Sequence, residues 1–377
     1  MESPFQYGTI AQNENFIDRV EERALLKQLL SSGVNVMLIS PRRWGKSSLV
    51  KNAMDELTRE KKNIKVCYID AFSINSEAEF YRTFASRVMS CAYNRLDKGL
   101  ESAKKLLSGI VPQLVFKDTI NEFLTIDVRF KPQEKDKIEI LQLPERIAKQ
   151  RGIRIIVCID EFQQVGEFPD SLTVQKRMRS VWQHQNNVSY CLFGSKMHMM
   201  TNLFQKKSYP FYKFGEMLYL KPIPLDSWTT YISERFAQAG KQISAELIQQ
   251  LCETVEYHAS YVQQLAYSTL LLAQDGVTYE VLTAAVEDLI AQNASIFIEQ
   301  TQSLTSYQLN FLRAILYGVN NGFNEKAVRE SFDLGVPSNI ARLKKSLIDK
   351  ELIEYTEKGV EIGDPVLRLW LKRVLFQ

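Results

Sequence analysis

An apolar run followed at once by a short loop and a helical pattern constrains this chain more than any other feature. The run is Val34 to Ser40, and the loop after it reads Pro-Arg-Arg-Trp-Gly-Lys-Ser-Ser, ending at Ser48. The next residues, LVKNAMDELTRE, repeat apolar side chains at helical spacing. A strand, a tight loop and a helix are therefore predicted in direct succession.

The loop is close to the pattern GxxxxGK[ST], which cradles phosphate groups. Ser40 stands at the first glycine, and Gly45, Lys46 and Ser47 match the remainder. Backbone N–H groups at a helix N-terminus bind phosphate, the lysine neutralises it and the hydroxyl is a Mg²⁺ ligand. An ordinary helix start is the alternative. We predict nucleotide contacts along the loop, from Pro41, Arg42, Arg43, Trp44, Gly45, Lys46, Ser47 and Ser48.

Two adjacent carboxylates end a later apolar run, Ile153 to Phe162. Phosphoryl transfer needs one carboxylate for the metal and, when water attacks, another to orient and polarise that water. We assign Asp160, with Ser47, to Mg²⁺ and Glu161, with Lys46, to catalysis. Such a pair can also be a plain polar loop start, but its position downstream of the phosphate loop favours the catalytic interpretation.

Two further polar residues are candidates. Ser195 follows the apolar run that begins at Val188, where it would either sense the γ-phosphate or cap the next helix. His258 opens a helical segment, ASYVQQLAY, from which it could reach the nucleotide. A lone histidine at a helix start is usually structural.

Near-continuous apolar strands alternating with helices predict an α/β fold with a parallel sheet covered on both faces. The expected strands are Val34 to Ser40, Ile64 to Phe72, Ile153 to Phe162, Val188 to Ser195 and Glu216 to Ile223. A helix over Phe16 to Leu30, with Asp18 as a plausible cap, is expected before them. Residues 93–145 show poor periodicity and receive no assignment beyond a strand pair or an insertion near Leu124.

Three domains are expected: an α/β domain over 1–222, a helical lid over 223–297 and a third domain over 298–377. The third contains three helical patterns and then a hairpin around Glu357 to Gly359, which is the order of a winged helix. No apolar run approaches a membrane span and no basic leader precedes an apolar core, so a cytoplasmic protein is expected. The five cysteines lack CxxC spacing and are expected to be reduced.

With these motifs placed, the chain resembles the archaeal-type ATPase family of the STAND branch of AAA+ proteins. The likeness spans nearly the whole chain and rests on FIDRVEE, ISPRRWGKSSLV, IVCIDEFQ, CLFGSKMHMM, YHASYVQQLA and IGDPVLRLWL. It implies ATP and Mg²⁺ bound between the α/β domain and the lid, and roles for Ser195 and His258. Ala259 departs from the proline usual after that histidine. Arg177 and Arg179 are weak candidates for an arginine finger that would act in an oligomer, although STAND members often lack one.

The partner is less defined. The net charge is only +3, and a predicted recognition helix over Ser338 to Lys350 offers Asn339, Arg342, Lys344 and Lys345 to DNA. Intramolecular contact or contact with a protein is favoured over contact with DNA. The leading hypothesis is an ATP-driven conformational switch; the rivals are an ATP-dependent DNA-binding protein and a scaffold that holds ATP without hydrolysing it.

Overall fold

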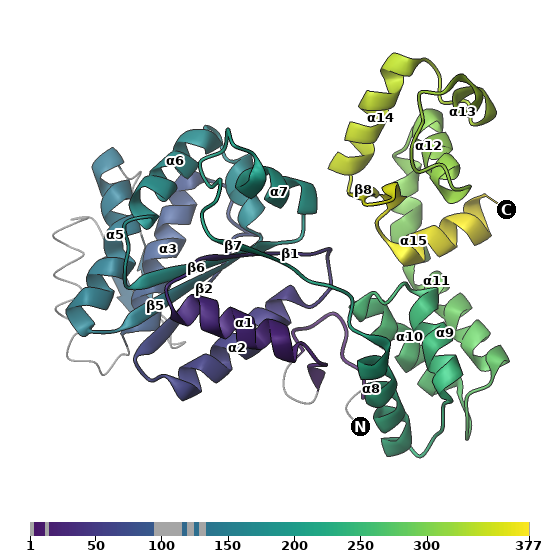
Figure 1. Cartoon of the computed structure of the whole chain (residues 1–377), viewed down its shortest axis with the longest axis horizontal. Helices are drawn as coiled ribbons and strands as arrows, with labels where there is room; N and C mark the ends of the chain where they lie inside the picture. Colours follow the sequence, from purple (N-terminus) through teal and green to yellow (C-terminus); the bar gives the residue numbers. More distant parts are fainter. Residues whose placement is uncertain (1–3, 12–14, 94–114, 119–123, 128–132, 377) are drawn as a thin grey trace. The chain divides into compact units, whose positions relative to one another are not determined.

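The computed structural model describes residues 4–11, 15–93 and 133–376, with the backbone of 115–118 and 124–127. It contains two compact units. The α/β unit comprises Arg19–Arg42 and Lys46–Lys221, and the helical unit comprises Met1–Asp18, Arg43–Gly45 and Pro222–Gln377 (Figure 1).

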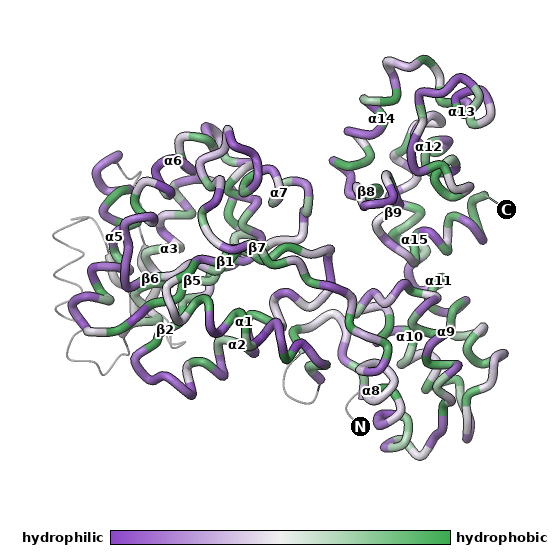
Figure 2. Tube along the Cα trace, in the orientation of Figure 1, coloured by the Kyte–Doolittle hydropathy of each residue, from purple (hydrophilic) through white to green (hydrophobic). Residues whose placement is uncertain are grey.

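Five parallel strands form the sheet of the α/β unit, in the order β2-β5-β6-β1-β7. Their bounds are β1 Val36–Ile39, β2 Ile64–Asp70, β5 Arg154–Asp160, β6 Val188–Gly194 and β7 Glu216–Tyr219. Every residue of β1 and β6 is buried, as expected for inner strands covered on both faces, and the apolar character of these strands can be followed in Figure 2. The predicted parallel sheet is confirmed, strand by strand.

Helices cover both faces of this sheet (Figure 1). One face carries α1 Val20–Ser31 and α2 Lys46–Glu60; the other carries α3 Glu77–Ala92, α5 Glu134–Arg151 and α6 Ser171–Trp182. A 3₁₀-helix, η2 Phe162–Glu167, and α7 Met197–Gln205 complete the unit. Aromatic rings fill its core, and Trp182 stacks on Tyr190 with ring centroids 4.1 Å apart.

Two local expectations require correction. The first helix begins at Val20, not at Phe16, because Asp18 and Arg19 both adopt the left-handed backbone conformation, with φ of 54° and 67°. Asp18 does not cap it; the Asp18 carboxylate accepts a hydrogen bond from Ser227 Oγ at 2.9 Å instead.

The segment without a clear period contains the first part of α5, whose pattern is interrupted by Pro144 inside the helix. It also contains an antiparallel pair, β3 Val115–Asp118 with β4 Leu124–Asp127, so a strand pair is indeed present near Leu124. The rest of the stretch from residue 94 to residue 132 lies outside the described residues.

The helical unit begins with four helices, α8 Leu225–Gln238, α9 Ala245–Thr254, α10 Ala259–Leu272 and α11 Tyr279–Gln302. The N-terminal segment joins them: Phe5 is buried against Tyr231 and Phe236, and the Gln6 N–H donates to Gln263 Oε1 at 3.0 Å. Residues from opposite ends of the sequence thus share one core.

The C-terminal part of this unit is a winged helix, as predicted. Its elements are α12 Ser306–Leu316, α13 Lys326–Ser331, α14 Pro337–Asp349, the hairpin β8 Ile353–Thr356 with β9 Gly359–Ile362, α15 Pro365–Trp370 and a π-helical turn, Leu371–Leu375. Phe311 stacks on Phe323 at 4.3 Å inside it.

One helix of the described chain, α11, is long and apolar enough to cross a membrane by length and composition. It packs against α10 and α15 and buries Leu282, Leu289 and Phe297 among other residues. The contacts are those of a core helix. All the cysteines are free thiols, and four of them are buried.

Candidate functional site

The carboxyl ends of β1, β5 and β6 lie side by side, because β6 is placed between β5 and β1 in the sheet. The loop from Ser40 follows β1, Asp160 ends β5 and Ser195 follows the last residue of β6. In open α/β sheets this edge is where ligands bind. The fold therefore brings together predicted residues that are more than a hundred positions apart in the sequence.

The loop after β1 is shaped by Gly45 and Lys46. Gly45 has a φ of +89°, which an L side chain rarely adopts. Ser40, where the pattern has glycine, is fully buried with no left-handed φ, so the serine fits without strain. The first residue of α2 is Lys46, so the free N–H groups of this helix terminus face the loop.

Lys46 is bonded to the loop itself. Its ammonium donates to the Ser40 carbonyl at 2.9 Å and to the Pro41 carbonyl at 2.8 Å, and it is 5% exposed. Burial lowers the pKa of Lys46 to about 8, against the raising effects of Glu161 and Asp160. A buried cation whose partners are neutral carbonyls suits an anionic ligand.

Ser47 and Asp160 form the second contact of the site. The Ser47 hydroxyl donates to Asp160 Oδ2 at 2.6 Å, and the Glu161 N–H donates to Asp160 Oδ1 at 2.8 Å. Burial raises the pKa of Asp160 to about 6, although the Ser47 hydrogen bond opposes the shift. A desolvated carboxylate beside a hydroxyl oxygen is a donor set that Mg²⁺ accepts.

Among the described residues, all the hydrogen-bond donors to Glu161 contact one of its two carboxylate oxygens. Its Oε2 accepts from Ser195 Oγ at 3.0 Å, from the Ser195 N–H at 3.3 Å and from Gln163 Nε2. Glu161 also has a positive φ, 49°, at the end of the strand. Ser195 thus contacts the catalytic candidate directly, whereas Gln163 has no role in the sequence-based assignment. Its only sequence signal is its position two residues after Glu161.

The tip of the phosphate loop, Arg43–Gly45, belongs to the helical unit. There the Trp44 ring lies edge-on to His258, with centroids 6.4 Å apart, and His258 lies 4.7 Å from the Tyr261 ring. His258 occupies the N-cap position of α10 and is 8% exposed. Among the other loop residues, Arg42 is exposed, Pro41 is half-buried and Ser48 is buried.

Neither candidate arginine finger extends freely from α6. Arg177 contacts the carboxylates of Glu77 and Glu134 and lies 3.3 Å from the Tyr81 hydroxyl. Arg179 lies over the Phe214 ring, 4.9 Å from its centroid, and burial lowers its pKa. Both guanidinium groups take part in the packing of the α/β unit.

Two of the four residues proposed to meet DNA do not point outward from α14. Asn339 is buried and donates to the Leu334 carbonyl at 3.4 Å, and Lys344 lies 4.8 Å from the Phe323 ring centroid. Arg342 and Lys345 are exposed.

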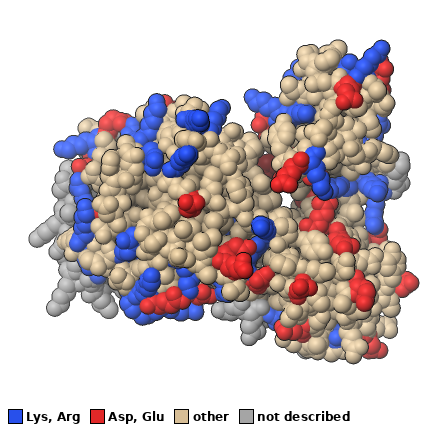
Figure 3. All heavy atoms as spheres, in the orientation of Figure 1, with Lys and Arg blue, Asp and Glu red and all other residues tan. Residues whose placement is uncertain are grey.

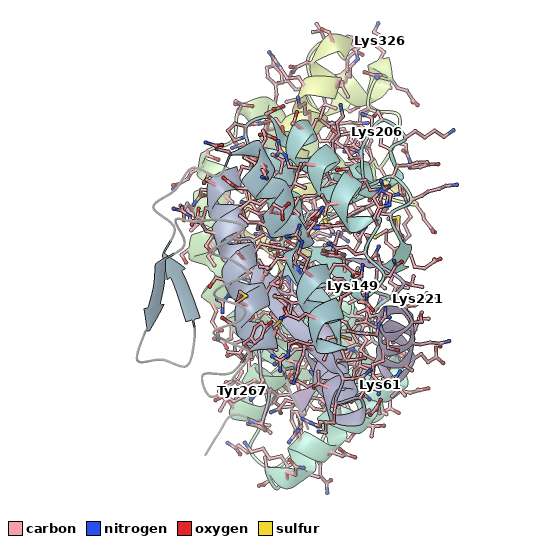
Figure 4. All side chains as sticks on the ribbon, turned by 90° about the vertical axis from the view of Figure 1, so that its left-hand side faces the viewer. Lys61, Lys149, Lys206, Lys221, Tyr267 and Lys326 are labelled. Carbon is pink, nitrogen blue, oxygen red and sulfur yellow. The ribbon has the colours of Figure 1, made fainter. Side chains whose placement is uncertain are left out.

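The charged side chains outside α14 give the DNA-binding alternative little further support. Lys326 of α13 extends outward at the edge of Figure 4. On the face drawn in Figure 3, Lys and Arg gather over the upper part of the α/β unit, whereas Asp and Glu are the more frequent charged residues over the helices at the lower right. Neither sign covers the whole face.

Comparison with protein families identifies the two parts of the chain. Residues 16–250 match the model of an ATPase domain predominantly from Archaea. The chain belongs to this family. Residues 295–373 match a probable winged helix domain. No curated protein sequence matches the chain. Family membership makes this protein a nucleotide-binding ATPase-domain protein with a C-terminal winged helix, in agreement with the resemblance noted in the sequence.

Solved structures share the fold over almost the whole chain. The Walker-type ATPase PABY2304 of Pyrococcus abyssi has a TM-score of 0.67 at 16% identity, covering 98% of this chain and 99% of that one. The ORC2 protein of Aeropyrum pernix, in ADPNP-ADP complexes, has a TM-score of 0.57 at 16% identity, covering 99% and 100%. The ORC1 protein of the same organism, in complex with DNA, has a TM-score of 0.51 at 12% identity, covering 99% and 98%.

Proposed function

We propose that the protein is a Mg²⁺-dependent ATPase whose hydrolytic cycle acts as a conformational switch. The observation that carries the proposal is the Ser47–Asp160 hydrogen bond beside the buried Lys46, at the edge of the sheet where Glu161 also lies. This edge of the sheet therefore offers a suitable residue to the phosphates, to the metal ion and to the attacking water.

The residues at this edge of the sheet fit Mg²⁺ and the nucleotide phosphates, the two groups that hydrolysis requires. Among the described residues there is no cluster of three or more His, Cys, Asp and Glu that could hold a metal by itself. That is the usual situation for Mg²⁺, which is held by one or two protein oxygens together with substrate phosphates and water. Ser47 and Asp160 would hold it, and the ion would neutralise charge on the phosphates. Lys46 and the N–H groups at the start of α2 would bind the phosphates themselves.

Glu161 is the residue that we assign to orienting and polarising the attacking water. Within the described chain its Oε1 has no hydrogen-bond donor, while Oε2 is anchored. A carboxylate with one oxygen available can accept a proton from attacking water. Ser195, bonded to the same carboxylate, would connect the state of Glu161 to the γ-phosphate.

The switch is supported by contacts of the loop tip. Trp44 packs against His258, and the charge of Arg43 acts on the Tyr261 side chain. The Tyr261 hydroxyl donates to Asp364 Oδ2 at 2.6 Å, and Asp364 caps α15 of the winged helix. A rearrangement of the loop on nucleotide binding would therefore act on α10 and on α15.

Finer assignments belong to the same proposal. We divide the chain into an ATPase domain, 1–222, a lid, 223–297, and a winged-helix domain, 298–377, and we favour the STAND type. The last boundary falls inside α11, which continues to Gln302. DNA binding is the second candidate function, with Arg342 and Lys345 as its contacts. A protein partner would use the same winged-helix domain.

The test is steady-state ATP hydrolysis with Mg²⁺ by the wild type, Lys46→Ala and Glu161→Gln, with and without duplex DNA. We expect Lys46→Ala to weaken nucleotide binding, and Glu161→Gln to keep binding while turnover falls on the order of 10²- to 10⁴-fold.

Three outcomes count against these assignments. Unchanged turnover in Glu161→Gln would contradict the catalytic assignment. Solution scattering that is identical with ADP and with a non-hydrolysable ATP analogue would contradict the switch. Stimulation by duplex DNA, lost on reversing the charge of Arg342 and Lys345, would favour the second candidate.

A further inference from the structure

Gln163 is an inward-facing polar residue that the proposed mechanism does not require. It lies in η2, for which Glu161 is the N-cap residue, just after β5 ends at Asp160, and it is 2% exposed. Buried glutamine is uncommon, and when present its amide normally has hydrogen-bond partners. The partners of this amide are therefore informative.

The amide nitrogen of Gln163 donates to Glu161 Oε2. Because Ser195 contributes both its N–H and its hydroxyl, that oxygen accepts from three donors. The other carboxylate oxygen, Oε1, accepts from none in the described parts of the chain. The carboxylate is thus fixed by one oxygen and presents the other.

The strand beneath Gln163 is adapted to this amide. A Cβ on Gly194 would lie 1.9 Å from Gln163 Oε1 and 3.0 Å from its Cδ. Gly194 does not have a positive φ, so glycine is not required by the backbone at this position. What requires it is the space that the Gln163 side chain fills.

Hydrogen bonding within the core does not explain why a glutamine fills the space above Gly194. Gln163 Oε1 is buried and has no hydrogen-bond partner among the described residues. A buried unpaired carbonyl costs stability. An apolar side chain of similar size would fill the same space without that cost, so the packing alone does not favour glutamine.

We propose that Gln163 is a positioning residue, which holds the Glu161 carboxylate in the orientation that presents Oε1 to the attacking water, and that Gly194 supplies the room for it. The inference rests on the proposed hydrolytic function, and it adds Gln163 and Gly194 to the residues that serve that function. Gln163 itself need not touch nucleotide or water. Its effect should therefore appear in kcat and leave nucleotide affinity unchanged.

The experiment compares Gln163→Ala, Gln163→Met, Gly194→Ala and the double variant Gln163→Ala with Gly194→Ala. For each, kcat and KM for MgATP are measured together with the Kd of a fluorescent ATP analogue. Gln163→Met keeps the side-chain volume and removes the donor, so it separates positioning from packing. Gly166→Ala, whose added Cβ would meet nothing closer than 3.8 Å, is the matched glycine control.

We expect both Gln163 variants and Gly194→Ala to lose kcat on the order of ten- to a hundredfold, with Kd within about twofold of wild type. The double variant should be no slower than Gln163→Ala, because the side chain that Gly194→Ala would displace is already gone. Gln175→Leu is a second control: neither amide atom of this buried glutamine of α6 has a hydrogen-bond partner in the described part of the chain, and its substitution should leave kcat unchanged.

Two results separate this inference from the function on which it rests. If the wild type hydrolyses ATP and Glu161→Gln does not, yet the Gln163 variants keep their kcat, positioning by Gln163 is wrong and the ATPase assignment stands. Losses that multiply in the double variant would also overturn it. A wild type without turnover would overturn both.

Discussion

Two pairs of carboxylates in this protein are arranged in opposite ways. In the α/β unit, Asp160 and Glu161 are neighbours in sequence, and each accepts hydrogen bonds from hydroxyl or N–H donors. In the winged helix, Glu354 of β8 and Glu361 of β9 stand directly opposite each other across the hairpin. Arg368 is the cation that acts on Glu354, and Glu256 adds a further negative charge.

The two pairs of carboxylates differ in the role of their negative charge. Hydrogen-bond donors hold the first pair in a fixed geometry at the edge of a sheet, where charge can act on a ligand. The second pair has like charges across a ladder, which destabilises a hairpin. Burial first, and then the charge of Glu361, raise the pKa of Glu354 to about 7. Changes to the first pair should therefore alter activity, and changes to the second should alter stability.

Among the changes that test this distinction, the largest effect is expected from Asp160→Asn. Hydrolysis should fall on the order of a hundredfold, because the proposed Mg²⁺ ligand would be weakened. The melting temperature should stay equal or rise, because burial disfavours the charged form of Asp160. Glu354→Gln is the matched control and should raise the melting temperature without changing hydrolysis. A lower melting temperature for Asp160→Asn would contradict the distinction between the two pairs.

A third arrangement, carboxylates paired with cations, gives an intermediate expectation. Glu77 is bonded by both Arg177 and Lys137, and the Arg177 side chain is 10% exposed. We expect Arg177→Ala to lower the free energy of unfolding by roughly 2 kcal/mol, as for a partly buried ion pair that loses one partner. Urea titration measures this.

Arg177→Lys should restore only part of that stability, since an ammonium is a point charge that lacks the rigid, planar set of donors of a guanidinium. A full loss of ATPase activity with unchanged stability would instead favour the arginine-finger role.

The smallest effect should come from Glu361→Gln. The pKa of Glu354 is raised in the folded state above its ordinary 4.5, so between about pH 4.5 and 7 the folded protein binds more protons than the unfolded chain. The stability associated with Glu354 is therefore lost as the pH rises through that window.

We expect Glu361→Gln to stabilise the protein by about 1 kcal/mol at pH 8 and by less at pH 5. Melting curves at the two pH values would check this. An equal gain at both would show that repulsion from Glu361 does not act on Glu354.

Sequence reasoning was most successful where period and spacing carry the information. The five apolar runs could be placed because each is bounded by polar residues, and Asp160 follows such a run directly. It failed at α5, where Pro144 breaks the pattern although the packed helix tolerates it. It could not single out Gln163, because the reason for that residue is a space above Gly194, which no local pattern records. The sequence also could not show which residues of α14 point outward, because that depends on side-chain directions. Asn339, for example, is buried.

The place of Phe5 in the helical unit has a consequence for synthesis of the chain. The Tyr231 hydroxyl contacts the Pro4 carbonyl across 227 positions of sequence. At about 5–20 residues per second, the ribosome needs roughly 10 to 45 seconds between making the two. During that interval the α/β unit can fold, while the N-terminal segment has no core to enter. Its apolar side chain must remain exposed on the nascent chain, which makes this stretch a natural point for chaperone contact.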